Sequence, residues 1–202
     1  MELKNKYFLL RHGQTIYQKE GRKVNYEADS PFKLEITEEG REMIKKSTEI
    51  LKKTCAEQGQ SIDLIFASPF LRAKQSAEIV SKVLGIKKIN YDECLGDINL
   101  GEFMGKPMEE SSKFYLEGKN KFENRPKGGE SWADILKRTK SFLDDVEKKY
   151  QGKNILVISH ADPIWLMAGV LKGFVKDEQF LNSRRSEDKK DLYPKVGELI
   201  KI

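Results

Sequence analysis

The sequence contains few of the residues on which disulfide-rich, zinc-binding or membrane-spanning proteins depend. Among 202 residues there are two cysteines and two histidines, and they do not have the spacing of a zinc site. Cys55 and Cys94 form no CxxC motif, so we expect reduced and partly buried thiols. No apolar run approaches the length of a transmembrane helix. These absences exclude a disulfide-stapled secreted domain, a zinc finger and a helical membrane protein.

The beginning of the chain leaves little room for a targeting segment. Only residues 1–6 precede the apolar run that begins at Tyr7. A signal peptide needs its own apolar region and cleavage site, so we expect the protein to stay in the cytoplasm. The length fits one domain over residues 1–202, with a loop-rich lid insertion at about residues 92–130.

The net charge of the chain and its distribution indicate which kinds of ligand the protein binds. The net charge is +5, and charged residues make up 34% of the chain. A basic excess attracts anions, including phosphate esters and nucleic acids. The basic residues are spread among nearly as many acids, without a basic helix or aromatic–basic interleaving. We therefore expect a small phosphorylated partner, no nucleic acid and no membrane; a homodimer is left open.

Short apolar runs alternate with amphipathic helical segments along the whole chain. Expected strands are residues 7–10, 62–67, 86–91, 154–159 and, at an edge, 196–200. Expected helix starts are Thr37, Ser68-Pro69, Ser131 and Asp162-Pro163, with a small helix near residues 109–116. Residues 16–36 are expected to be an irregular loop, and the buried face of the helix after Thr37 to contain Met43, Ile44, Ser47, Ile50, Leu51 and Thr54. The alternation predicts an α/β fold, a three-layer sandwich whose mostly parallel central sheet is flanked by helices.

Each histidine directly follows a predicted strand. His12 lies in RHGQT after the first strand, and His160 lies in SHADP after the fourth. Ligands of open α/β sheets bind at the carboxyl ends of the strands. Arg11 precedes His12, and Arg72 falls in the first turn of the helix after the second strand, so guanidinium groups are expected at the same edge. Two imidazoles beside arginines suit phosphoryl transfer with a histidine nucleophile.

Five motifs in order resemble those of the histidine phosphatase superfamily, in the branch of phosphoglycerate mutase and fructose-2,6-bisphosphatase. They cover nearly the whole chain: residues 11–15 (RHGQT), 37–40 (TEEG), 68–77 (SPFLRAKQSA), 127–131 (KGGES) and 157–160 (VISH). Each motif alone is weak evidence. Their shared order, on the expected strands and helices, is a strong signal for a phosphoglycerate mutase-like fold.

The resemblance implies roles for individual residues. His12 is expected to be the nucleophile that forms a phosphohistidine, while Arg11, Arg72 and His160 hold the phosphoryl group, His160 in its cationic form. No metal and no cofactor are implied. Gln18 lies where the family often has a phosphate-contacting asparagine. Lesser candidates are Thr15, Glu102 and Glu130, of which Glu130 is expected to position pocket arginines.

One departure from the family pattern concerns the general acid. The family usually has a glutamate in Leu-x-Glu-x-x-x-Gly, and here Asp97 occupies that position in LGDINLG. Aspartate can transfer the same proton, but its stem is one methylene shorter, so backbone or substrate must come closer. Glu93 and Glu102 are nearby substitutes. We favour Asp97 because geometry decides which group can act as general acid.

Three functions fit these residues. The first is a metal-independent phosphomonoester hydrolase that acts on a small phosphorylated metabolite through a phosphohistidine intermediate. A phosphomutase of the phosphoglycerate mutase type is the runner-up; the family's mutases carry His-Gly-Asn-Ser in the stretch where this chain has residues 159–162 (SHAD). The third is a catalytically weak protein that binds phosphorylated ligands, suggested by the missing glutamate at position 97.

Overall fold

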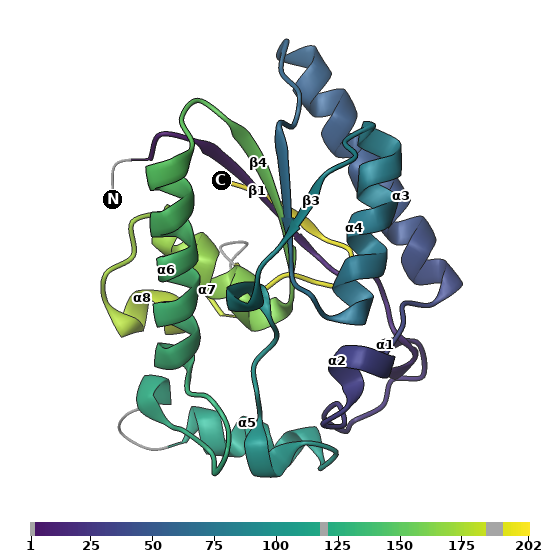
Figure 1. Cartoon of the computed structure of the whole chain (residues 1–202). Helices are drawn as coiled ribbons and strands as arrows, with labels where there is room; N and C mark the ends of the chain where they lie inside the picture. Colours follow the sequence, from purple (N-terminus) through teal and green to yellow (C-terminus); the bar gives the residue numbers. More distant parts are fainter. Residues whose placement is uncertain (1–2, 118–120, 185–191) are drawn as a thin grey trace.

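The computed structural model describes residues 3–117, 121–184 and 192–202, and a five-stranded sheet forms its centre (Figure 1). The strand order is β3-β2-β4-β1-β5. Strand bounds are β1 Lys6–Arg11, β2 Leu64–Ala67, β3 Ile89–Tyr91, β4 Asn154–Ser159 and β5 Leu199–Lys201. The first four are parallel, and β5 runs antiparallel beside β1. The predicted mixed α/β fold with a mostly parallel sheet is confirmed.

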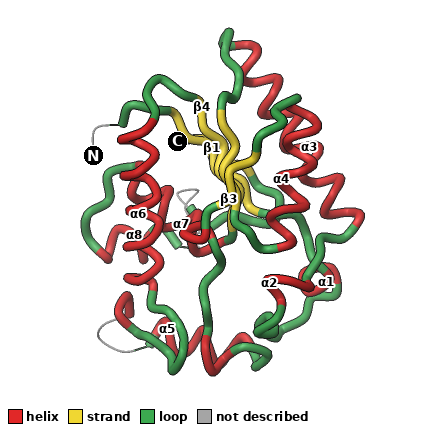
Figure 2. The backbone as a smooth tube through the Cα atoms, in the orientation of Figure 1, coloured by secondary structure: helices red, strands yellow, loops and turns green. Residues whose placement is uncertain are grey.

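Helices cover both faces of the sheet, so the fold has three layers (Figure 2). Helices α3 (Glu38–Glu57) and α4 (Leu71–Leu84) pack on one face, against side chains such as Phe8 and Leu10. Helices α6 (Trp132–Lys149) and α7 (Ala161–Leu171) pack on the other, against Tyr7 and Leu9, and α8 (Asp177–Asn182) contacts α7. Successive residues of β1 thus alternate between two apolar cores, as a strand buried on both faces requires.

Three predicted strands are shorter than expected. The edge strand expected at residues 196–200 covers Leu199–Lys201. Residues 62–63 precede β2, and the third strand begins at Ile89 and not at residue 86. The reason lies at the end of α4, where Gly85 is left-handed (φ 73°) and the Ile86 N–H donates to the Ser81 carbonyl. The Ile86 backbone therefore caps a helix and is not free to join the sheet.

Two of the four predicted helix caps are confirmed and two are wrong. Thr37 accepts the Gly40 N–H, and Ser131 forms a reciprocal capping box with Asp134. By contrast, α4 begins after Phe70, not at Ser68-Pro69, and α7 begins after His160, not at Asp162-Pro163. The side chains of Ser68 and Asp162 are instead used in tertiary hydrogen bonds near the strand ends.

The buried face of α3 differs from the predicted one. Met43 and Ile50 are 36% and 55% exposed, whereas the buried residues are Gly40, Ile44, Thr48, Leu51 and Cys55. Gly40 explains the rotation, because a Cβ there would lie 2.4 Å from the Gln14 carbonyl oxygen. The backbone contact holds this side of the helix against the chain after β1, and the buried stripe follows from it.

The remaining short elements gather beyond the carboxyl ends of β1 and β4 (Figure 1). Residues 16–36, expected to be irregular, contain two one-turn helices, α1 (Ile16–Lys19) and α2 (Ser30–Lys33). Between residues 92 and 130 lie the predicted small helix, α5 (Met108–Leu116), and the 3-10 turns Glu93–Leu95, Gly101–Phe103 and Lys121–Glu123. The Asn25 N–H donates to the Lys106 carbonyl, which joins the two segments. None of the helices in the described ranges is long and apolar enough to cross a membrane.

A buried carboxylate ties α6 to the start of β1. Glu147 accepts hydrogen bonds from the Lys4 N–H (2.6 Å), the Asn5 amide (2.9 Å) and the Tyr7 hydroxyl (2.6 Å). We expect Glu147→Ala to lower the free energy of unfolding by about 2–4 kcal/mol, because three donors lose their acceptor. Urea denaturation measures this. Asp145→Ala, on the exposed face of the same helix, is the control and is expected to change stability by less than about 0.5 kcal/mol. Equal losses in both variants would contradict the analysis.

Candidate active site

Strand register brings the two histidines together. Arg11 pairs with Ser159 across β1 and β4, so the next residues, His12 and His160, leave the sheet at the same level. Their ring centroids are 5.2 Å apart with an interplanar angle of 56°, and both residues are 0% exposed. The predicted juxtaposition of two imidazoles is therefore present, although 148 positions separate them in the sequence.

The tautomer of His12 is determined by a backbone carbonyl. Its Nδ1 lies 2.8 Å from the Gly13 carbonyl oxygen, which can only accept, so Nδ1 carries the proton and Nε2 has a free lone pair. Among the described residues, Nε2 has no hydrogen-bond partner although it is buried. Burial, followed by the charge of Arg72, lowers the pKa of His12 well below the ordinary value. These features favour a neutral His12 whose Nε2 lone pair is contacted by no hydrogen-bond donor of the described residues.

The backbone after His12 is held by close contacts. The Gly13 N–H donates to the Ser76 hydroxyl (3.1 Å), which in turn donates to the Arg72 carbonyl (2.7 Å). A Cβ on Gly13 would lie 2.6 Å from the Gly40 carbonyl oxygen, so only glycine fits against the start of α3.

Arg72 presents unpaired donors from the first turn of α4, as predicted. It is 1% exposed, and its guanidinium carbon lies 4.7 Å and 5.5 Å from the ring centroids of Tyr26 and Phe70. Its Nη2 donates to Asp97 Oδ2 (2.8 Å). Within the described chain, its Nε and Nη1 are buried without hydrogen-bond partners. Aromatic rings therefore hold a cation that retains hydrogen-bonding capacity for an anion.

His160 lies between the Ser68 hydroxyl and the Asp97 carboxylate, and its burial disfavours the cationic form. Its Nε2 lies 2.8 Å from the Ser68 hydroxyl, while Nδ1, 3.6 Å from Asp97 Oδ2, has no hydrogen bond among the described residues. Burial, followed by the charges of Arg72 and Arg11, lowers the pKa of His160 well below its ordinary value. A negative charge added to the site would oppose this effect and favour the protonated form.

Asp97 lies between the phosphate-binding candidates. Its Oδ2 contacts Arg72 at 2.8 Å and approaches His160 at 3.6 Å, while Oδ1 accepts its neighbour's N–H. The alternatives Glu93 and Glu102 are exposed, and Glu102 accepts the Lys127 N–H at 3.1 Å. Of these three acids, Asp97 is the one that contacts both the arginine and the second histidine.

Other predicted residues lie around this centre in different roles. Arg11 donates from Nη1 to the Pro194 carbonyl (2.8 Å), and its buried Nε lacks a partner in the described chain. Gln18 accepts hydrogen bonds from the backbone and hydroxyl of Thr15 and donates to the Tyr26 hydroxyl. Gln18 and Thr15 therefore support the first turn of α1 and the ring beneath Arg72. Glu130 pairs with Arg138 at 2.9 Å and not with Arg11 or Arg72.

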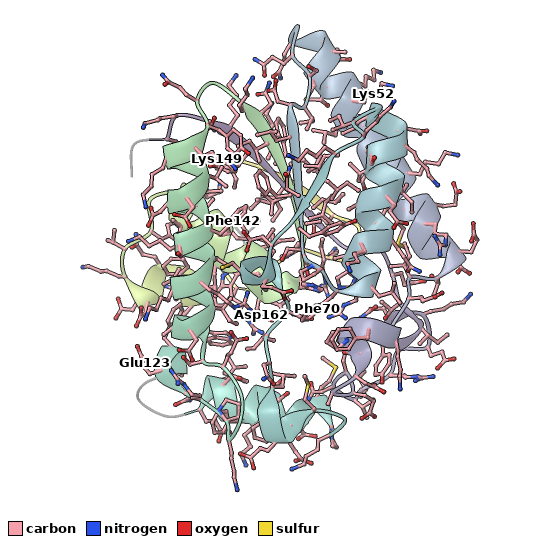
Figure 3. The ribbon with its side chains drawn as sticks, viewed as in Figure 1. Lys52, Phe70, Glu123, Phe142, Lys149 and Asp162 are labelled. Atoms are coloured by element: carbon pink, nitrogen blue, oxygen red, sulfur yellow. The ribbon has the colours of Figure 1, made fainter. Side chains whose placement is uncertain are left out.

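Two cavities adjoin Asp97, at the strand ends near the labelled side chains of Phe70 and Asp162 (Figure 3). One, of about 400 Å³, is lined by Arg11, Asp162 and Arg184. The other, of about 500 Å³, is lined by Arg72, Phe70 and several apolar side chains. An ester oxygen beside Asp97 can thus belong to a molecule that extends into either space.

Several site residues were not identified from the sequence. Ser68 was considered only as a helix cap, and Arg184 only as part of a loop at residues 182–190, of which residues 185–190 lie outside the described ranges. Tyr26 and Arg138 carry no local motif, because their positions depend on contacts between distant segments. Within the described residues, no three His, Cys, Asp or Glu side chains gather so as to hold a metal ion.

Comparisons with known proteins agree with this geometry. The family model described as "Histidine phosphatase superfamily (branch 1)" matches residues 7–181. "Phosphoserine phosphatase 1" of Hydrogenobacter thermophilus is 25% identical over 83% of this chain and 76% of its own length. "Phosphoglycerate mutase-like protein 4" of Arabidopsis thaliana is 28% identical over 77% of this chain and 66% of its own length. In fold, the chain is similar to a mycobacterial glucosyl-3-phosphoglycerate phosphatase (TM-score 0.69, 20% identity, 87% and 86% of the two chains covered).

The lowered histidine pKa values predict a specific pH dependence. The unfolded chain binds a proton at each histidine near pH 6.5, whereas the folded protein does not, so the free energy of unfolding falls as the pH drops below about 6.5. With only two histidines, the Cε1–H NMR signals of the folded protein are readily followed, and we expect neither to shift between about pH 6 and pH 8. The urea-unfolded chain is the control and should titrate near pH 6.5. A folded-state midpoint at or above that value would refute the expectation.

Proposed function

The chain belongs to branch 1 of the histidine phosphatase superfamily, and on that basis we propose that it hydrolyses phosphomonoesters of small metabolites through a phosphohistidine on His12. The observation that supports this most directly is the set of buried nitrogens without hydrogen-bond partners in the described chain, on His12, His160 and Arg72. Buried donors without partners are uncommon and unfavourable. A phosphoryl group supplies the missing acceptors with its three oxygens, beside the lone pair of His12.

The first step is transfer of the phosphoryl group. Nε2 of His12 attacks phosphorus, the nitrogen–phosphorus bond forms, and the bond from phosphorus to the ester oxygen breaks. Arg72, Arg11 and His160 bind the phosphoryl oxygens, and the added negative charge favours protonated His160. Because these oxygens compete with Asp97 for Arg72, substrate binding frees the Asp97 carboxylate. The freed carboxylate takes up a proton from water and passes it to the leaving alkoxide.

The second step releases phosphate. Water enters where the alcohol has left, Asp97 accepts its proton, and the resulting hydroxide oxygen attacks phosphorus as the bond to His12 breaks. Inorganic phosphate and the starting form of His12 result. In this scheme the cationic side chains stabilise the charge that divalent metals stabilise in other phosphoryl-transfer enzymes. A chelator is therefore not expected to reduce turnover.

The two alternative functions use parts of the same site. A phosphomutase shares the first step, and a binding protein shares only the binding of the phosphorylated ligand. A phosphomutase has to keep water out until the intermediate returns its phosphoryl group, and relatives named as phosphatases favour the hydrolase. A binding protein without turnover does not need Asp97 next to Arg72 and His160. A coupled assay with 3-phosphoglycerate and a bisphosphoglycerate primer separates mutase from hydrolase. The cytoplasmic location and the homodimer remain predictions.

Removal of the nucleophile tests the mechanism. We expect His12→Ala to lower kcat/KM for p-nitrophenyl phosphate by roughly 10³-fold or more, because the substrate loses its covalent acceptor. The wild-type protein, quenched in alkali during turnover, should carry an acid-labile, base-stable phosphohistidine that the variant lacks. Circular dichroism checks that the variant is folded. Retained activity in a folded His12→Ala protein would overturn the proposal.

A further inference from the structure

Arg184 lies in the same cavity as Arg11, although the two residues are 173 positions apart. It follows α8 and is 13% exposed at its side chain. Its guanidinium carbon lies 4.8 Å from the Trp132 ring centroid, 4.6 Å from that of Tyr193 and 5.6 Å from that of Trp165. Three aromatic rings therefore hold the planar group in one orientation, so that little side-chain entropy remains to be lost when it binds an anion.

The charge of Arg184 is only partly balanced. Its ion-pair partner among the described residues is Asp162, at 3.8 Å, which is too long for a direct hydrogen bond. Asp162 accepts instead from the Trp132 indole and the Tyr193 hydroxyl, both at 3.1 Å. Burial also raises the pKa of Asp162, despite the nearby charge of Arg184. In the described chain, the buried Nε of Arg184 has no hydrogen-bond partner.

The cavity connects this guanidinium to the reacting centre. Arg11 and Asp97, the proposed phosphate ligand and proton donor, line the same space, and Arg22 and Lys23 make it more cationic. From these contacts we propose that Arg184 binds a second anionic group on the substrate, so that the preferred substrates are phosphomonoesters with a carboxylate or second phosphate. This inference rests on the proposed function. The apolar cavity beside Phe70 would favour uncharged leaving groups instead.

The role of Arg184 is tested by measuring ligand binding in a variant that cannot hydrolyse the ligand. In the His12→Ala background, calorimetry compares three ligands with a three-carbon body: glycerol 3-phosphate, 3-phosphoglycerate and propane-1,3-diyl bisphosphate. The first has no second anion, the second has a carboxylate and the third a phosphate. We expect at least one anionic ligand to bind at least tenfold more tightly than glycerol 3-phosphate. The better of the two identifies the recognised group.

Substitution of Arg184 then removes the preference. Arg184→Gln should weaken binding of the preferred anionic ligand at least tenfold and change that of glycerol 3-phosphate less than about twofold, while Arg184→Lys restores part of the difference. Equal weakening for the ligands with and without a second anionic group, or no preference before substitution, would overturn the subsite. Failure of the proposed function shows separately, as absence of p-nitrophenyl phosphate turnover in protein with the natural His12.

A second observation concerns the segment that carries Asp97. Arg138 of α6 donates from Nη1 to the Cys94 carbonyl (2.5 Å) and from Nη2 to the Asp97 carbonyl (3.2 Å). Its Nε and Nη2 also bind the two carboxylate oxygens of Glu130, at 2.9 Å and 3.3 Å. Glu130 in turn accepts the Asn99 N–H at 2.9 Å. The pair thus holds the backbone on both sides of Asp97.

The geometry points to Arg138 as a positioning residue for the proposed general acid. It acts through the main chain at residue 97, because its hydrogen bonds reach that carbonyl and not the carboxylate. An aspartate side chain is short, so a small displacement of its backbone moves the proton out of reach of the ester oxygen. The Glu130–Arg138 pair is partly buried, and both of its parallel hydrogen bonds constrain the orientation.

Leaving-group dependence distinguishes positioning from a general structural role. Nitrophenolate leaves without protonation, whereas phenolate benefits from it. We expect Arg138→Gln to lower kcat/KM for phenyl phosphate roughly tenfold or more and for p-nitrophenyl phosphate less than about threefold. The ratio is unaffected by the fraction of folded protein. Arg138→Lys should recover part of the ratio, and Arg125→Gln, which breaks an exposed pair with Asp134, should leave it unchanged. Equal losses for both esters, or no loss, would overturn the assignment.

Discussion

The parallel pairing of β1 with β4 is the constraint on which the site depends. Both strands are buried on both faces, and each of residues 7–10 of β1 belongs to one of two apolar cores. A slip of one residue would exchange the two sets of side chains, for instance Phe8 with Leu9, so the register is strongly specified. The positions of His12 and His160 follow from that register. The separation of the two imidazoles is therefore determined by hydrophobic packing in the two cores beneath the site.

Within this frame, the site places polar groups where water is largely excluded and leaves several of their hydrogen bonds unmade. Such burial is unfavourable unless an acceptor is provided. Part of the cost is offset by the rings of Tyr26 and Phe70 against Arg72, and part by the Asp97 carboxylate. The rest of this unfavourable free energy comes from buried nitrogens of His12, His160 and Arg72 that have no hydrogen-bond partner in the described chain. The site therefore favours binding of an anion. The unpaired polar groups lower the stability of the fold, but they are already in place to bind an anion.

The sequence predicts that His12, His160 and Arg72 lie at one edge of the sheet, because the position of each depends on local signals. An apolar run gives a strand, the residue after it lies at the sheet edge, and a helix start places Arg72 there too. The errors share one cause. Ser68 and Asp162 have the residue types of helix caps, but their side chains are used in contacts with His160 and Trp132 that join distant segments. The face of α3 was wrong because a backbone contact at Gly40, and not the apolar pattern, sets its rotation. Arg138 and Arg184 act across similar distances, so no local pattern could reveal them.

The replacement of glutamate by aspartate at position 97 is consistent with this geometry. The carboxylate already reaches Arg72 at 2.8 Å, and its backbone carbonyl is held by Arg138. A side chain longer by one methylene, on the same held backbone, would extend farther into the space between Arg72 and His160, where we propose that the phosphoryl group binds. The shorter side chain contacts both groups from the rim of this space and can yield its place at Arg72. The hydrogen bonds of Arg138 to the main chain and the short side chain of Asp97 are thus complementary: the first fix where the side chain begins, and the second limits how far it reaches.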